Sequence, residues 1–235
     1  YRPLIVPRRL NRYLLREIFT LGIPISITQF LNGAMFTVAA VVVGIIGAVT
    51  LAAQQIVYSV IYLALSASAA LGDAVRVRVA YGIGHGSVDA SRLSANISFL
   101  LAALTTFLAA LLLWTIPGIL VGIFLDTSDP DNEAVLRISI GLSAYAGMFL
   151  LLDGVLMVVA NAIRGLRDTK SPLWISLAGY WAVGLGSGVW LCFPKGYGAD
   201  GLWWGLVAGV LFSNVIMYWR FSKRLAEARH TLAGV

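Results

Sequence analysis

The chain has 235 residues, of which 59% are hydrophobic and only 12% are charged, about half the charged share of an ordinary soluble domain. A soluble domain of this length cannot bury so much apolar sequence, so the composition excludes a soluble globular protein. The formal net charge of +6 does not indicate a nucleic-acid partner, because the basic residues stand at the ends of long apolar runs.

Six apolar spans follow one another along the chain. Residues 18–72 carry no charge, and one helix of that length would be about 80 Å long, more than twice the hydrocarbon core of a bilayer. This run must therefore fold back, and Gly47 to Thr50 mark the turn. Gly, Pro and charge clusters divide the remainder, which predicts spans at about 19–45, 51–72, 95–122, 136–163, 172–193 and 201–220. An extension of the second span to Val79 is left open.

The length and apolar character of these spans predict helices. A segment in lipid must satisfy its own backbone hydrogen bonds, which a helix does within itself. We therefore expect an all-α membrane protein with a six-transmembrane-helix bundle over residues 19–221. A basic cytoplasmic lead-in at 1–18 precedes it, and a cytoplasmic tail at 222–235 follows.

The distribution of basic residues predicts the orientation in the membrane. Fifteen of the 17 Lys and Arg residues fall in the N-terminal segment, the 2–3 and 4–5 connections and the C-terminal segment, and only Arg137 and Lys195 fall on the other side. Basic residues concentrate in cytoplasmic loops, so we expect both termini in the cytoplasm and a multi-pass membrane protein. Aromatic residues near the span ends are expected at the interfaces: Trp174, Trp190, Trp203, Trp204, Tyr218 and Trp219.

Asp153 is the most informative residue of the fourth span. No other charge occurs between Arg137 and Arg164. Eleven helical residues separate Asp153 from Arg164, which is about 16 Å and about half of the hydrocarbon core. A carboxyl group near the midplane costs several kcal/mol to ionise, so such residues are rare and usually functional. We interpret Asp153 as a proton or cation coupling residue; the structural alternative is a permanently protonated or Arg-paired acid.

The first two spans also carry polar side chains. Gln29, Asn32 and Phe36 fall on one helical face by their spacing. The second span carries Gln54, Gln55 and Tyr58. These side chains either form hydrogen bonds between helices or line a cavity, and the sequence favours neither interpretation. We take Gln29, Asn32, Gln54, Gln55 and Tyr58 as candidate cavity-lining residues.

Catalytic and metal-binding patterns are absent from the sequence. His85 and His230 are expected in separate cytoplasmic segments without metal-ligand spacing, and no Ser/His/Asp set lies in the spans. We therefore expect no enzyme activity, no metal site and no cofactor.

Several motifs occur in an order that is similar to a known transporter family. The stretch from Ile163 to Pro172 is similar to "L-R-G-x-x-D-T-x-x-P", and Leu51 to Gln55 is similar to "A-A-H-Q" with Gln54 in place of His. Further similar segments are Leu21-Gly22-Ile23-Pro24, Arg78-Val79 with Gly84, Tyr180-Trp181 with Gly184, and the stretch from Gly198 to Gly205. Over residues 15–221 the chain resembles the C-terminal half of a multidrug and toxic compound extrusion (MATE) transporter.

This resemblance implies one lobe of a twelve-helix, pseudo-symmetric antiporter of the bacterial inner membrane that exports amphipathic, often cationic, drugs against inward H⁺ or Na⁺. Its partners would be a small-molecule substrate, the bilayer and a missing N-terminal six-helix lobe. In members with a cation site in this lobe, an acid precedes the "R-G" motif, and Asp153 stands at that position. The partner acid would stand at Asn32, so one of two carboxylates is missing. A lone carboxylate makes a weak site for a hard cation.

Two alternatives remain open. One is a flippase for lipid-linked precursors from the same superfamily, which would carry more basic residues in its cavity. No Lys or Arg lies deep in the first, second, third, fifth or sixth span, which counts against it. The other is a non-transport scaffold or a half-size protein that dimerises.

Overall fold

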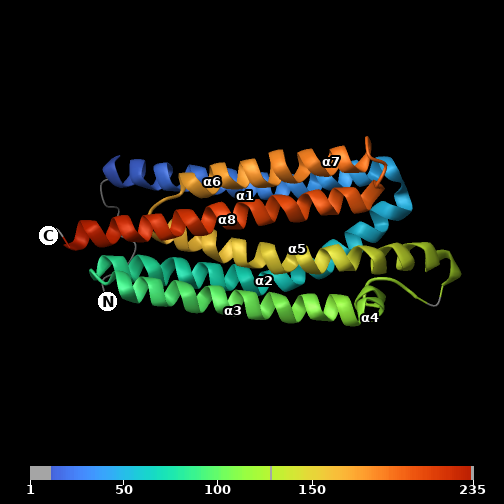
Figure 1. Ribbon diagram of the computed structural model, residues 1–235, viewed down its shortest axis with the longest axis horizontal. Coiled ribbons are helices and arrows are strands. Elements are labelled where there is room, and N and C mark those ends of the chain that lie inside the picture. Colours follow the sequence, from blue (N-terminus) through green and yellow to red (C-terminus); the bar gives the residue numbers. More distant parts are fainter. Residues whose placement is uncertain (1–11, 128, 234–235) are drawn as a thin grey trace.

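The computed structural model describes residues 12–127 and 129–233, and in these ranges it contains helices and no strand (Figure 1). Six helical runs are long and apolar enough to cross a membrane. They are α1 (Arg12–Ile46), α2 (Ala48–Gly84), α3 (Val88–Thr115), α5 (Glu133–Gly165), the continuous run of α6 (Lys170–Ser176), η2 (Leu177–Leu185) and α7 (Gly186–Cys192), and α8 (Gly198–Ala233). The predicted all-α, six-helix membrane fold is therefore confirmed.

The helices extend past the apolar spans. α2 continues beyond residue 72 through Asp73 and Arg76, while α1 already begins at Arg12 and α8 continues to Ala233. The predicted lead-in and tail are thus helical wherever they are described, and residues 1–11, 234 and 235 lie outside the described residues. The predicted spans end at charged residues, because charged side chains are excluded from the hydrocarbon core. Charged residues are nevertheless good helix formers, so the helices continue past the spans.

The third predicted span, 95–122, is divided in two. α3 ends at Thr115, and the short helix α4 (Pro117–Gly122) begins after Ile116, whose backbone is non-helical (φ −133°, ψ 44°). Pro117 causes the break, since proline has no N–H to donate and disfavours a helical residue before it. A 3-10 turn, η1 (Pro130–Asn132), then leads into α5.

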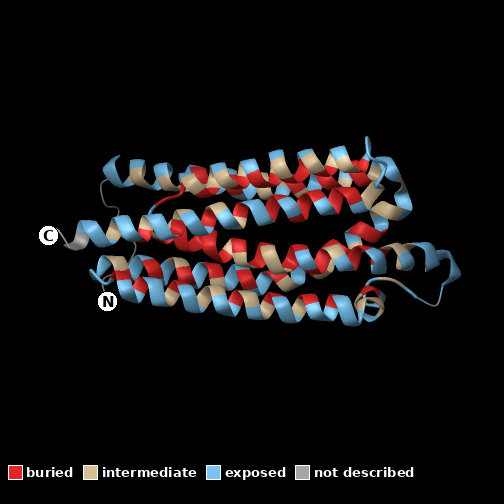
Figure 2. Ribbon diagram, viewed as in Figure 1, coloured by how far each residue is buried: buried red, intermediate tan, exposed pale blue. Residues whose placement is uncertain are grey.

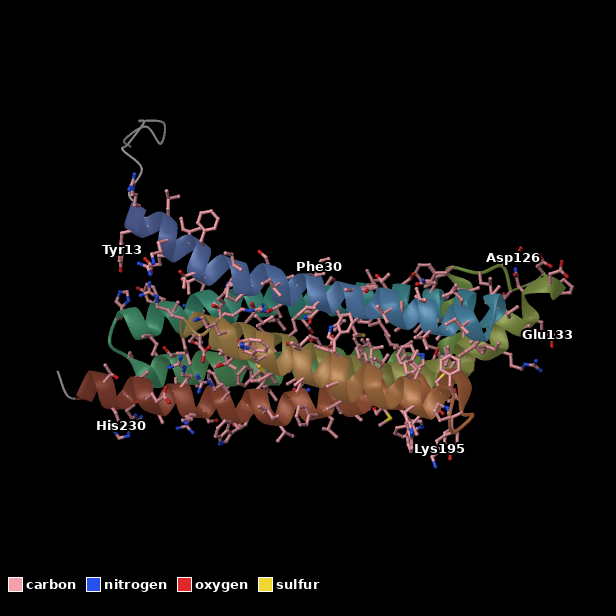
Figure 3. All side chains as sticks on the ribbon, turned by 90° about the horizontal axis from the view of Figure 1, so that it is seen from above. Tyr13, Phe30, Asp126, Glu133, Lys195 and His230 are labelled. Atoms are coloured by element: carbon pink, nitrogen blue, oxygen red, sulfur yellow. The ribbon has the colours of Figure 1, made fainter. Side chains whose placement is uncertain are left out.

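The long helices run antiparallel between two ends of an elongated bundle. Tyr13 and His230 lie at one end, and Asp126, Glu133 and Lys195 lie at the other (Figure 3). We call the first the basic end, because the α2–α3 turn, the α5–α6 connection and the terminal part of α8 bring most of the basic residues there (Figure 1). The other end carries the connection from α4 to α5. We call it the acidic end, because this connection and the start of α5 contain Asp126, Asp129, Asp131 and Glu133.

α5 is the central helix of the bundle. In its most apolar stretch 72% of the residues are buried, compared with 22% in α1 and in α3 (Figure 2). Gly154 lets α5 approach α2 closely, because a Cβ atom at this position would lie 2.8 Å from Ser68 Oγ. Asn214 of α8 donates to the Leu152 carbonyl oxygen (3.0 Å), which fixes α5 from the other side. Asp153 therefore sits on the most enclosed helix, between two such contacts.

Small residues also bring α8 against the run of η2 and α7. A Cβ atom on Gly209 would lie 2.6 Å from Gly184 Cα, and one on Gly205 would lie 2.6 Å from the Gly184 carbonyl oxygen. The two backbones touch because these glycines have no side chain. Trp203 departs from its predicted place at the interface: it is fully buried and packs against Tyr58.

Asp168 ties the α5–α6 connection to α8 at the basic end. Its buried carboxylate accepts hydrogen bonds from Arg220 (2.7 and 3.0 Å), from Arg224 (2.8 Å) and from the backbone N–H and hydroxyl of Ser171 (3.0 and 2.8 Å). Burial acts to raise the pKa of Asp168, but these hydrogen bonds outweigh it and bring the pKa to about 2. The charged carboxylate therefore connects the α5–α6 connection to the start of α6 and to α8.

Candidate functional site

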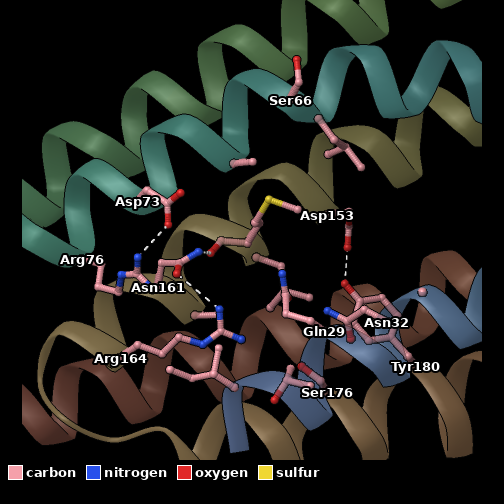
Figure 4. Close-up of a pocket in the computed structure, with 18 of the residues that line it drawn as sticks. Gln29, Asn32, Ser66, Asp73, Arg76, Asp153, Asn161, Arg164, Ser176 and Tyr180 are labelled. Carbon is pink, nitrogen blue, oxygen red and sulfur yellow. Dashed lines mark hydrogen bonds and ion pairs between the residues drawn. The ribbon is translucent and has the colours of Figure 1, made fainter. Parts of the chain in front are cut away.

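A cavity of about 380 Å³ lies between α1, α2, α5, α6 and η2 (Figure 4). This volume is in the range of sites for small organic molecules. The cavity begins near the middle of the bundle, at Asp153 and Tyr180, and extends along α5 to Arg164 near the basic end. Its walls are largely apolar, with a few polar groups that converge on the interior, which is the usual composition of a ligand site.

Asp153 lies at the inner part of the cavity. Its side chain is only 4% exposed, and its carboxylate accepts a hydrogen bond from the Tyr180 hydroxyl. Among the described residues, Asp153 forms no ion pair. A carboxyl group that lacks a cationic partner can take up a proton or attract a cation from the cavity.

Tyr180 reaches Asp153 from a π-helical segment. η2 is π-helical over nine residues, and Tyr180 lies in its first half. A π-helix changes the direction in which side chains leave the axis, and such segments are frequent at functional sites. The irregular backbone thus delivers the hydroxyl that donates to the buried acid.

Two of the predicted lining residues share this cavity with Asp153. Gln29 and Asn32 of α1 both line it, together with Phe36, the third residue of that face. The Asn32 side-chain oxygen is buried and accepts no hydrogen bond among the described residues. The position where the resemblance expects a second acid therefore presents a free acceptor to the same cavity as Asp153.

The residues predicted on α2 lie elsewhere. Gln55 is exposed, while Gln54 and Tyr58 are buried, and none of the three lines this cavity. An aromatic cluster of Phe36, Tyr58, Tyr62, Phe149 and Trp203 lies next to the inner part of the cavity. Phe36 and Tyr62 line the cavity, and Tyr58 lies behind them toward the acidic end.

No metal site of the usual kind is present in residues 12–127 and 129–233. No three His, Cys, Asp or Glu side chains come together there in a way that could hold a metal ion.

The family model described as MatE matches residues 24–190. The chain belongs to the MatE family. The matched region contains Asp153, Tyr180 and all the other residues of the cavity. The resemblance inferred from the sequence motifs is thus confirmed.

Relatives and solved structures agree with this assignment. The MatE chain is 37% identical over 211 residues to "Multidrug resistance protein NorM" of Burkholderia vietnamiensis, covering 90% of this chain and 46% of that protein. A crystal structure of MATE in the bent conformation is similar with a TM-score of 0.86 at 14% identity, covering 97% of this chain and 49% of that one. The Vibrio cholerae MATE transporter VcmN is similar with a TM-score of 0.82 at 20% identity, covering 93% and 49%. The MatE chain spans about half the length of the proteins it matches.

Sequence reasoning missed the polar residues toward the basic end of the MatE cavity. Asp73 and Arg76 of α2 and Asn161 and Arg164 of α5 line this end (Figure 4). The three charged residues ended predicted spans or stood in connections, whereas both helices continue there and bring all four side chains to the edge of the cavity. The spacing of Asp73 to Arg76 and of Asn161 to Arg164, three residues each, was a signal that they share helical faces.

Proposed function

We propose that this chain is one lobe of a secondary transporter that exports amphipathic or cationic small molecules by antiport with H⁺ or Na⁺. The observation that carries the proposal is Asp153, a buried carboxylate that lines a ligand-sized cavity and has no cationic partner among the described residues. The multidrug resistance name of the NorM relatives supports the substrate class.

Asp153 would couple transport to the ion. A proton or Na⁺ on Asp153 removes the negative charge from the cavity, and its release restores a site for a cationic substrate. The free Asn32 oxygen can accept a hydrogen bond from a substrate ammonium group or contribute a ligand to Na⁺. Occupancy of Asp153 would then bias the rocking of this lobe against its partner between inward-open and outward-open states.

The partner would be a second six-helix lobe. Matches that cover about half of each relative support it, as does the row of large exposed apolar side chains on α1, which includes Ile23, Phe30, Val38 and Val41. The charge distribution supports cytoplasmic termini, with the basic end at the cytoplasm. The NorM relative of Burkholderia vietnamiensis supports a place in the bacterial inner membrane.

The flippase alternative gains one observation from the cavity. Arg76 and Arg164 both line its basic end, although basic residues were not expected there. Asp73 lies 3.1 Å from Arg76 and offsets its charge, so this cluster carries a net charge of only about +1. A pyrophosphate group carries more negative charge than one cation can match, so the drug/cation transporter remains the favoured function. A scaffold would have no need for a buried acid in a cavity.

The proposed function is tested by dye efflux from drug-sensitive bacteria that express the complete gene. Asp153→Asn should reduce ethidium efflux at least tenfold, to the level of cells without the transporter, while the amount in the membrane stays the same. Asp131→Asn, which removes an exposed carboxylate at the acidic end, is the matched control and should keep wild-type efflux. Efflux at the wild-type rate by Asp153→Asn would rule out the proposed role of this residue.

A further inference from the structure

Arg164 is a largely enclosed cation that the transport mechanism above does not use. Its guanidinium makes one hydrogen bond among the described residues, from Nη1 to Asn161 Oδ1 (3.3 Å). Its Nε atom is buried without a partner, and no carboxylate pairs with it in residues 12–127 and 129–233. The side chain as a whole is only partly buried. A cation that is enclosed in this way is costly unless an anion meets it, so the guanidinium without a carboxylate partner points to an anionic ligand.

The surroundings keep Arg164 in the cavity. Asn161 is held in turn, since its amide group donates to the Met157 carbonyl oxygen (3.0 Å) and packs against Gly72 of α2. Gly165, the next residue, lies so close to α2 that a Cβ atom there would be 2.7 Å from the Arg76 carbonyl oxygen. The backbone that carries Arg164 is thus fixed against α2, and its guanidinium lies beside the cavity (Figure 4).

The nearby charges leave Arg164 available to an anion. Arg76 already has a carboxylate partner in Asp73, at 3.1 Å, and both of these side chains are more exposed to solvent. Arg164 therefore supplies the uncompensated positive charge at this end of the cavity. Its guanidinium can present two parallel N–H donors to a carboxylate, an arrangement that a single ammonium group does not match.

The cavity consequently has poles of opposite sign. Asp153 is the negative pole, and eleven residues of α5, about 16 Å along the helix, separate it from Arg164. Between them the wall is mostly apolar, with Leu65, Leu156, Met157 and Ala160, and it also includes Ser66 and Ser176. An elongated amphipathic molecule with a cationic group at one end and an anionic group at the other matches this distribution.

We propose that Arg164 forms an anion subsite that binds the carboxylate of zwitterionic amphipathic substrates while their cationic group lies toward Asp153. This inference rests on the proposed transport function and narrows its substrate class. Asn161 positions the guanidinium, and Arg76, paired with Asp73, adds little direct contact.

The test compares binding of two dyes to the purified, detergent-solubilised full-length protein. Tetramethylrhodamine carries a delocalised cation and a carboxylate; its methyl ester keeps the cation and loses the anionic charge. The measured quantity is the ratio of the two dissociation constants, obtained by fluorescence anisotropy. In Arg164→Gln the preference for the free acid over the ester should fall about tenfold, the usual scale for one hydrogen bond to a charged group.

Two further variants make the result specific. Arg164→Lys keeps the charge but loses the planar fork, so it should retain part of the preference and also decides the question if the Gln variant does not fold. Lys170→Gln removes an exposed cation at the same end and should leave the ratio unchanged.

The outcomes separate this inference from the proposed function. A ratio unaffected by either Arg164 variant would mean that Arg164 only extends its guanidinium toward solvent and that no subsite exists. An equal loss of affinity for both dyes would also overturn the subsite. If the wild-type protein binds the ester as tightly as the free acid, the subsite is overturned while the proposed function stands, because the ester is itself an amphipathic cation.

Discussion

The Tyr180 hydroxyl donates a hydrogen bond to the Asp153 carboxylate, and this contact joins the central helix α5 to the π-helical segment η2. Both side chains are buried, at 4% and 5% exposure, so the contact is shielded from bulk water. Among the residues that the structure describes, the Tyr180 hydroxyl is the hydrogen-bond donor to the buried acid of the cavity. Loss of that hydroxyl should therefore affect transport more than it affects the fold.

Tyr180→Phe removes this donor and keeps the ring. We expect a reduction in dye efflux of about tenfold or more, since a hydrogen bond to a charged group contributes about 1.5 kcal/mol or more. The measurement is initial efflux rate at matched membrane abundance. Tyr197→Phe removes an exposed hydroxyl near the acidic end and serves as the control. Equal rates for the two variants would contradict a role of the Tyr180 hydroxyl.

Asp168→Asn should destabilise the protein. The change leaves Arg220 and Arg224 without their shared carboxylate, which we expect to lower the free energy of unfolding by about 2–4 kcal/mol. Glu227→Gln removes the other carboxylate that Arg224 contacts, at 3.0 Å, and should cost less than about 1 kcal/mol because that pair is exposed. Thermal unfolding in detergent compares the two variants. A smaller effect for Asp168→Asn than for Glu227→Gln would refute the stabilising role of the Asp168 carboxylate.

The same residue predicts a response to acid. The pKa of Asp168 lies at about 2, below its ordinary value of 3.8, because the hydrogen bonds from Ser171, Arg224 and Arg220 outweigh burial. Its stabilising contribution is therefore complete above pH 4 and is lost as the pH falls toward 2. With solvent screening at the partly exposed arginines, we expect a loss of about 1–2 kcal/mol over this interval. The difference in melting temperature between wild type and Asp168→Asn should shrink as the pH falls from 5 to 2; a constant difference would be inconsistent with this pKa.

Gly209→Ala should weaken the contact between α8 and η2. The added methyl group would lie 2.6 Å from Gly184 Cα, so the helices must separate. Overpacking of this kind costs about 1–3 kcal/mol. Gly141→Ala, with no atom within 4 Å of the added Cβ, is the control and should be neutral or slightly stabilising. Melting temperatures in detergent distinguish the two, and equal values would argue against direct backbone contact.

Much of the fold could be predicted because uncharged runs and charge clusters carry its main physical constraint. The bilayer requires apolar spans of about 20 residues, and the sequence displays them directly. Helix ends could not be predicted from charge, since Asp73 and Arg76 leave the apolar region and still continue α2. Pro117 was a visible signal for the division of the third span, and its effect on Ile116 follows from proline geometry.

The site was predicted only in part. Asp153 is notable in sequence because its charge is isolated, and Gln29 and Asn32 follow from α-helical spacing on a regular helix. The contact of Tyr180 depends on a π-helical backbone, which shifts the phase of side chains away from the 3.6-residue period. Arg164 was assigned to the headgroup region by its place at the end of a span, whereas contacts of α5 with α2 keep it beside the cavity. Such pairings between distant segments leave no local pattern in the sequence.

The most direct test of the central claim is ion flux in proteoliposomes that contain the full-length protein. Addition of a transported cationic dye should drive H⁺ or Na⁺ movement in the opposite direction, and Asp153→Asn should abolish that movement while Asp131→Asn retains it. Each ion is followed with its own fluorescent indicator, so the same experiment identifies the coupling ion. Substrate-driven ion flux of wild-type size in Asp153→Asn would contradict the account.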